Sequence, residues 1–121
     1  MKDHIEELRQ KAKDGDAAAQ HALGYKYEKG LGVDQDDKEA DKWYLKAAEG
    51  YTSAAEQGDA SAQNSLGNMY YEGHGVDQDD KAAVKWYTKS AEQGHATAQT
   101  NHGWMYENGR GLAQDDEAAV K

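Results

Sequence analysis

Residues 59–94 read DASAQNSLGNMYYEGHGVDQDDKAAVKWYTKSAEQG, and this stretch decides the fold because the chain contains it three times. Residues 16–44 (DAAAQHALGYKYEKGLGVDQDDKEADKWY) and 95–121 (HATAQTNHGWMYENGRGLAQDDEAAVK) align with it without gaps. Measured at the glutamine that the copies share, the period is 36 residues between the second and third copies and 43 between the first and second. A period of this size is typical of stacked structural repeats. The first copy therefore carries seven extra residues.

Each copy contains two helical patterns separated by glycines. In the second copy, apolar residues at three- and four-residue spacing predict the first helix: Ala62, Leu66, Met69 and Tyr70. A second set follows the run Asp77-Gln78-Asp79-Asp80: Ala83, Trp86, Tyr87 and Ala91. Gly73 and Gly75 lie between the two sets, as glycines do after a helix C-terminus. No alternating apolar pattern occurs, so we expect no strand.

A glycine recurs in the middle of each first helix, at positions 24, 67 and 103. Glycine costs about 1 kcal/mol relative to alanine in a helix interior. A cost repeated in every copy requires a repeated reason. We expect a neighbouring helix to approach each glycine closely, with a large Trp or Tyr side chain filling the space beside it.

The repeats predict one all-α domain over residues 1–121, because a single helix pair cannot bury its own apolar face. Four segments divide it: a lone capping helix at 3–15, repeat 1 with the insertion at 16–58, repeat 2 at 59–94, and a truncated repeat 3 at 95–121. In the lone helix, Ile5, Leu8 and Ala12 fall where the second helix of a repeat has its apolar residues. The last helix stops before the tryptophan position of the other repeats.

The insertion looks like a near-copy of the residues before it, since GYTSAAE follows WYLKAAE. Seven residues make almost two helical turns, so the apolar face drifts by only about 20°. We favour one long helix from about Asp36 to Gln57, with the apolar face continuing through it. The alternative is a break at Gly50 followed by a short extra helix. The sequence supports two interpretations of the insertion about equally: that it has a function, and that it is tolerated without one.

The repeated motif resembles the Sel1-like repeat (SLR) family, which is related to the tetratricopeptide repeats. In this chain it reads Ala62-Gln63-x-x-Leu66-Gly67-x-x-Tyr70-x-x-Gly73-x-Gly75-Val76 and continues through Ala83, Trp86, Tyr87, Ala91 and Gly94. The resemblance implies a right-handed α/α superhelix, a solenoid of antiparallel helix pairs, with about seven helices here. It also implies an adaptor or assembly scaffold. The cysteine pairs of the family's secreted branch are absent, because the chain has no cysteine.

Composition and motifs exclude several functions. The formal charge of −9 argues against nucleic acid and anionic lipid as partners. No signal peptide or transmembrane stretch is visible, so the cytoplasm and a processed periplasmic or secreted location both stay open. No Ser-x-x-Lys or other nucleophile–base pair occurs, and we expect no enzyme and no cofactor.

We also expect no metal site. The aspartate runs are explained by helix capping, as in the pair Asp36 and Glu39, and lack the glycine and distal glutamate of a calcium loop. The histidines show no zinc pattern. His95 and His102 share a seven-residue spacing, but His102 occupies a leucine position of the repeat and is interpreted as a packed side chain.

The predicted partner site lies on the first helix of each repeat, on the face beside the apolar stripe, where the copies differ. By resemblance, these helices line the concave surface. The site residues are His21, Tyr25, Glu28, Asn64, Asn68, Tyr71, Thr100, Trp104 and Glu107. The aromatic members would serve as binding anchors and the asparagines would hold a peptide backbone. The same aromatics are about as well explained by packing against neighbouring helices.

The leading interpretation is a module that binds a protein or a peptide on this concave surface. The alternative is a structural, self-assembling repeat protein, in which the lone N-terminal helix of one chain completes the truncated C-terminal end of another. Under this alternative the chain forms a homo-oligomer, and chains could exchange elements with one another. The duplicated segment also leaves open an engineered origin.

Overall fold

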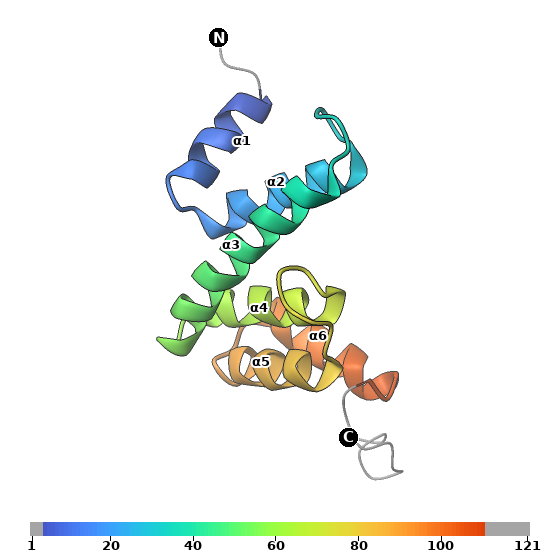
Figure 1. Cartoon of the computed structure of the whole chain (residues 1–121). Helices are drawn as coiled ribbons and strands as arrows, with labels where there is room; N and C mark the ends of the chain where they lie inside the picture. Colours follow the sequence, from blue (N-terminus) through green and yellow to red (C-terminus); the bar gives the residue numbers. More distant parts are fainter. Residues whose placement is uncertain (1–3, 111–121) are drawn as a thin grey trace. The chain divides into compact units, whose positions relative to one another are not determined.

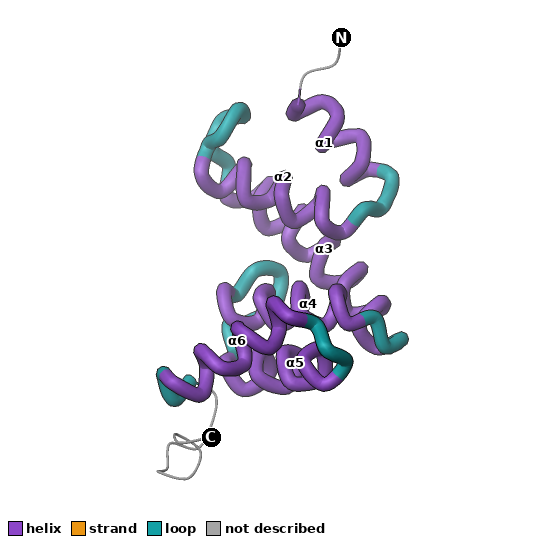
Figure 2. The backbone as a smooth tube through the Cα atoms, turned by 180° about the vertical axis from the view of Figure 1, so that it is seen from behind, coloured by secondary structure: helices purple, strands orange, loops and turns teal. Residues whose placement is uncertain are grey.

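The computed structural model of this protein describes residues 4–110, and these residues are all-helical. Figure 1 shows the helices in chain order: α1 (His4–Lys13), α2 (Ala17–Lys29), α3 (Asp37–Glu56), α4 (Ala60–Glu72), α5 (Asp80–Glu92) and α6 (Ala96–Glu107). Between residues 4 and 110 no strand occurs, and turns and loops connect the helices (Figure 2). The all-α fold predicted from the repeats is confirmed.

Of the expected number of about seven helices, six lie within the described range. The seventh was expected to follow the aspartates at 115 and 116, and those residues lie outside the range that the structure describes. Among the helices described, none combines the length and the apolar character needed to cross a membrane.

Two compact units are present. The first comprises Met1–Tyr51 together with the turn His74–Val76, and the second comprises Thr52–Gly73 together with Asp77–Lys121. In the first unit, Ala12 of α1 is buried with Ala19, Leu23 and Trp43, and Leu8 packs against this cluster. The N-terminal helix α1 thus packs against α2 and Trp43.

The core of the second unit lies between α4, α5 and α6. Ala83, Val84 and Tyr87 of α5 form a buried cluster with Met105 of α6. Two partly buried tyrosines of α4, Tyr70 and Tyr71, pack against this cluster.

The mid-helix glycines make room for tyrosine rings. A Cβ atom placed on Gly24 would lie 2.7 Å from the ring of Tyr44, and one placed on Gly67 would lie 2.6 Å from the ring of Tyr87. Carbon atoms of different residues do not approach this closely. The expected reason for the repeated glycine is confirmed at Gly24 and Gly67, and the same 20-residue offset joins each pair. At Gly103 no atom of the described residues lies within 4 Å of such a Cβ, so the expectation is not confirmed there.

Glutamine side chains tie each first helix to the helix before it. The Nε2 of Gln20 donates to the carbonyl of Ala12 at 3.0 Å, and that of Gln63 donates to the carbonyl of Ala55 at 3.1 Å. Carbonyls in the last turn of a helix have no intrahelical partner. Each of these carbonyls also accepts from a backbone N–H, that of Gly15 or Gly58, so the repeated glutamine is a second donor to a carbonyl at the end of the preceding helix.

Helix α3 runs for 20 residues and passes through Gly50 without a break. Residues 37–51 belong to the first unit and 52–56 to the second. Ala47, Ala48 and Ala55 are buried, so the apolar face continues as expected through the inserted segment. The predicted long helix is confirmed, and the alternative break at Gly50 does not occur.

Helix capping accounts for the aspartate run before α3. The Asp36 carboxylate accepts from the backbone N–H groups of Lys38 and Glu39, each at 3.1 Å. Asp79 caps α5 in the same way by accepting from the N–H of Ala82. This is the capping that the sequence indicated in place of a calcium loop.

We predict that Gly67→Ala lowers the free energy of unfolding by about 1–3 kcal/mol, the usual cost of inserting an extra methyl group into a packed core. The added methyl would strike the ring of Tyr87, which is only 3% exposed and has nowhere to move. Urea unfolding followed by circular dichroism measures the change.

The matched control is Gly103→Ala, at the equivalent position of α6. Among the described residues no atom lies within 4 Å of a Cβ placed there. Relief of the helical glycine cost should stabilise this variant by up to about 1 kcal/mol. Equal effects of the two substitutions would contradict the packing role of the glycines.

Candidate functional site

An open cavity of about 310 Å³ lies in the second unit. We call it the α4–α6 cavity. Its lining residues come from α4, α5 and α6: Asn68, Tyr71, Glu72, Tyr87, Asn101, Trp104 and Met105. Ligand cavities typically combine apolar and aromatic walls with a few placed polar groups. This lining has that character.

Two aromatic residues form one wall of the cavity. The rings of Tyr71 and Trp104 meet edge to face, with centroids 5.7 Å apart and planes at 90°. Such pairs contribute about 0.5–1.5 kcal/mol beyond the area they bury. Trp104 remains 42% exposed, so much of its indole surface is open to a partner.

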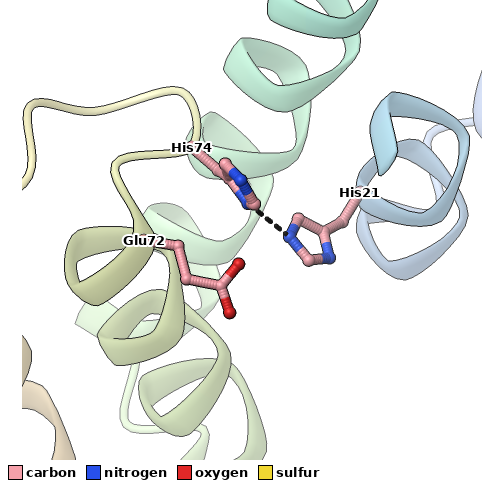
Figure 3. Close-up of side chains that lie close together, drawn as sticks. All are labelled: His21, Glu72 and His74. Carbon is pink, nitrogen blue, oxygen red and sulfur yellow. Dashed lines mark hydrogen bonds between the residues drawn. The ribbon is translucent and has the colours of Figure 1, made fainter. Parts of the chain in front are cut away.

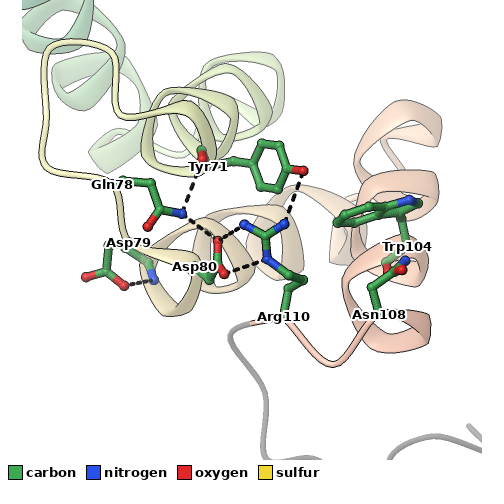
Figure 4. Close-up of polar contacts among 8 residues, drawn as sticks. Tyr71, Gln78, Asp79, Asp80, Trp104, Asn108 and Arg110 are labelled. Atoms are coloured by element: carbon green, nitrogen blue, oxygen red, sulfur yellow. Dashed lines mark hydrogen bonds and ion pairs between the residues drawn. The ribbon is translucent and has the colours of Figure 1, made fainter.

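Arg110 holds this aromatic pair from the side (Figure 4). Its guanidinium lies 4.8 Å from the centroid of the Tyr71 ring and 5.8 Å from that of Trp104. The same group donates to both carboxylate oxygens of Asp80, at 2.7 and 3.0 Å. Asp80 in turn accepts from Gln78 at 2.7 Å. A two-pronged ion pair of this kind fixes the plane of the arginine.

The hydrogen bond from Arg110 lowers the pKa of the Asp80 carboxyl group below its usual value, against a smaller opposing effect of burial. The same hydrogen bond raises the pKa of Arg110. Both groups therefore stay charged at neutral pH, and the cluster of Asp80, Arg110, Tyr71 and Trp104 keeps its ion pair.

Two asparagines present complementary groups in the cavity. The hydroxyl of Tyr87 donates to Oδ1 of Asn68 at 2.6 Å, and Nδ2 of Asn101 donates to Oδ1 of Asn64 at 3.0 Å. Within residues 4–110, these are the hydrogen bonds of the Asn68 and Asn101 side chains. Asn68 therefore keeps its amide N–H groups as donors, and Asn101 keeps its carbonyl oxygen as an acceptor.

Tyr87 fixes the orientation of Asn68. Burial raises the pKa of the Tyr87 hydroxyl, and the negative charge of Glu72 raises it further. The hydroxyl therefore stays protonated and acts as the donor in the bond to Asn68. The ring of Tyr87 packs closely against Gly67, so its hydroxyl has a fixed position. The hydrogen bond from this hydroxyl therefore fixes the orientation of the Asn68 amide.

The structure brings together three of the predicted partner-site residues, since Asn68, Tyr71 and Trp104 all line the α4–α6 cavity. Asn64 is buried, does not line the cavity, and accepts a hydrogen bond from the cavity residue Asn101. Thr100 and Glu107 are exposed on α6 and do not line the cavity.

The other three predicted residues lie on α2 in the first unit. Tyr25 is 45% exposed. His21 and Glu28 face His74, the middle residue of the segment Gly73-His74-Gly75. These two side chains therefore belong to a separate cluster.

Sequence reasoning missed several cavity residues. Asn101 stands where the other copies have Ala22 and Ser65, and this replacement of a small residue by an amide was a usable signal. Arg110 occupies the middle position of a Gly-x-Gly turn, where the earlier copies have Leu31 and His74. The three Gly-x-Gly segments hold Leu31, His74 and Arg110 at this position, so the variation itself marked it.

Comparison with known proteins identifies the repeat. The pattern of the Sel1 repeat matches residues 17–50, 60–95 and 96–121, which together make up most of the chain. The chain belongs to the Sel1 repeat family. Sel1 repeat proteins generally act as scaffolds for protein interactions. A search among curated proteins finds no match.

Solved structures of Sel1 repeat proteins resemble this one. The Sel1 repeat protein from Oxalobacter formigenes is 38% identical, with a TM-score of 0.58 over 95% of this chain and 81% of its own. A protective antigen from uropathogenic Escherichia coli strains, c5321, displays an SLR fold and is 32% identical, with a TM-score of 0.59 over 98% of this chain. This chain spans only 32% of the length of c5321.

We predict that Arg110→Gln raises the pKa of Asp80 towards 3.8, the value of an unperturbed aspartate. In the native chain the ion pair stabilises the fold above that pH, and the stabilisation is lost as the pH falls through the lowered pKa of the folded state. An NMR titration of the Asp80 carboxyl carbon measures both values. An unchanged pKa in the variant would contradict the contact.

Proposed function

We propose that this Sel1 repeat chain is a protein-binding module and that the α4–α6 cavity receives a short segment of the partner. The family supports the general role, since Sel1 repeat proteins are interaction scaffolds. One observation supports the location of the site: the partly buried Tyr71, the exposed Trp104 and two asparagines with complementary amide groups line the same open cavity.

The asparagine pair suits a peptide backbone. A peptide unit offers one carbonyl acceptor and one N–H donor. The donor left on Asn68 and the acceptor left on Asn101 match these two groups. A partner bound in this way gains hydrogen bonds that do not depend on its sequence.

The aromatic pair supplies the contact area. Tyr and Trp are the residue types most often found as energetic hot spots of interfaces, because they bury a large surface at a low entropy cost. Trp104 is partly exposed while Tyr71 and Arg110 hold it in place. A side chain of the partner that covers the indole buries apolar surface against a wall that is already ordered.

The sequence predicted a binding groove that extends over all three repeats. The site proposed here is smaller and lies in the second unit alone. Asn68, Tyr71 and Trp104 stay in the proposed site, with Asn101 added. No observation on residues 4–110 favours the self-assembly alternative.

The test is a selection of peptides from a random displayed library on the purified chain. Dissociation constants of the selected peptides are then measured by fluorescence anisotropy for the native chain, Tyr71→Ala and Trp104→Ala. Loss of a hot-spot aromatic costs about 2 kcal/mol or more, so we expect at least about 30-fold weaker binding in both variants.

Tyr25→Ala is the matched control, since it removes an exposed tyrosine that lies in the first unit and outside the α4–α6 cavity. This variant should bind like the native chain. Peptides that bind Trp104→Ala and Tyr71→Ala as tightly as the native chain, or a selection that yields no binder, would contradict the proposal.

A further inference from the structure

Two histidines that are 53 residues apart in the sequence meet within the first unit. His21 lies on α2, and His74 lies in the turn His74–Val76 that belongs to this unit. Their nitrogens Nε2 and Nδ1 face each other at 3.3 Å, and Figure 3 shows the two rings turned towards one another. Neither residue follows a zinc-binding spacing, so the sequence alone gave no reason to pair them.

The turn that carries His74 is seated on α3. Gly75, with φ of +75°, lies so close to the backbone carbonyl of Tyr44 that a Cβ atom there would have no space. The His74 ring stacks on the Tyr44 ring, with centroids 4.0 Å apart and planes 3° from parallel. The His74 side chain is 12% exposed. The imidazole is therefore held in one position by its backbone and by its face.

A carboxylate lies beside the other nitrogen of His74. Oε2 of Glu28 is 3.7 Å from Nε2 of His74, and Oε1 of Glu28 accepts from the Tyr44 hydroxyl at 3.3 Å. A neighbouring carboxylate favours the hydrogen on Nε2 and leaves the Nδ1 lone pair pointing to His21. If this 3.7 Å contact shortened to a hydrogen bond, it would be the arrangement by which a carboxylate orients and strengthens a histidine ligand of a metal ion.

The spacing of the two nitrogens fits a tetrahedral metal. Zinc–nitrogen bonds are about 2.0–2.1 Å long, so two imidazoles at the tetrahedral angle have their nitrogens about 3.3–3.4 Å apart. The observed separation of 3.3 Å meets this value. Imidazole nitrogen is a ligand that zinc prefers, whereas magnesium and calcium prefer oxygen.

We propose that His21 and His74 form a zinc-binding site, with Nε2 of His21 and Nδ1 of His74 as ligands and water in the remaining positions. Zinc replaces the hydrogen shared between the two nitrogens, and His21 then carries its hydrogen on Nδ1. Glu28 is a positioning residue that acts through Nε2 of His74. The proposal is independent of the α4–α6 cavity, which lies in the other unit.

The test is isothermal titration of the untagged full chain with zinc chloride, alongside His21→Gln, His74→Phe and Glu28→Gln. Phenylalanine keeps the stacking on Tyr44 and removes the ligand. We expect one zinc ion per native chain, loss of this binding in both histidine variants, and about 10- to 100-fold weaker binding in Glu28→Gln, the range for groups that orient a ligand. His4→Ala removes an exposed histidine of α1 and should bind like the native chain.

A second measurement uses only the native chain and therefore does not depend on whether a variant folds. In the native chain, the side-chain nitrogen resonances of His21 and His74 should shift on zinc addition, while those of His4, His95 and His102 stay in place. Magnesium chloride should shift none of them. Native affinity in either histidine variant, no zinc binding by the native chain, or shifts confined to the other histidines would overturn the proposal.

Discussion

The close approach of a tyrosine ring to a helical glycine is the constraint on which the rest of this structure depends. In each unit the glycine removes a Cβ atom at the one place where the tyrosine of the next helix must enter. Tyr44 and Tyr87 are 2% and 3% exposed, so each ring is fixed as part of the core. Without this contact the two helices of a pair would lie at a different distance from each other. The side chains along the edge of the pair would then lie in different positions.

The same tyrosine that packs the core also orients the functional groups. The Tyr87 hydroxyl extends from the contact with Gly67 and sets the direction of the Asn68 amide in the α4–α6 cavity. In the first unit, the Tyr44 ring supports His74 on one face, and its hydroxyl donates to Glu28. Equivalent positions of the repeat thus hold different chemistry in the two units, because the residues around the tyrosine differ.

Sequence reasoning predicted the parts of the structure that repetition and helical periodicity determine. The helix pairs, the reason for the glycines at 24 and 67, and the unbroken α3 all follow from residues of known helical position. The contacts of His74 and Arg110 could not be predicted, because each lies in the middle of a Gly-x-Gly turn. A turn's side chain is directed by its own backbone angles and by the helix it meets, and neither has a sequence period.

The most direct test of this account is an NMR measurement of nuclear Overhauser effects between the Hα protons of Gly67 and the ring protons of Tyr87. The closest ring carbon would lie 2.6 Å from a Cβ on Gly67, so the Hα proton that points in that direction should give strong effects to the ring. Gly24 and Tyr44 should show the same pattern. Absence of these effects in the folded chain would contradict the glycine–tyrosine contact and the arrangement of the cavity that is built on it.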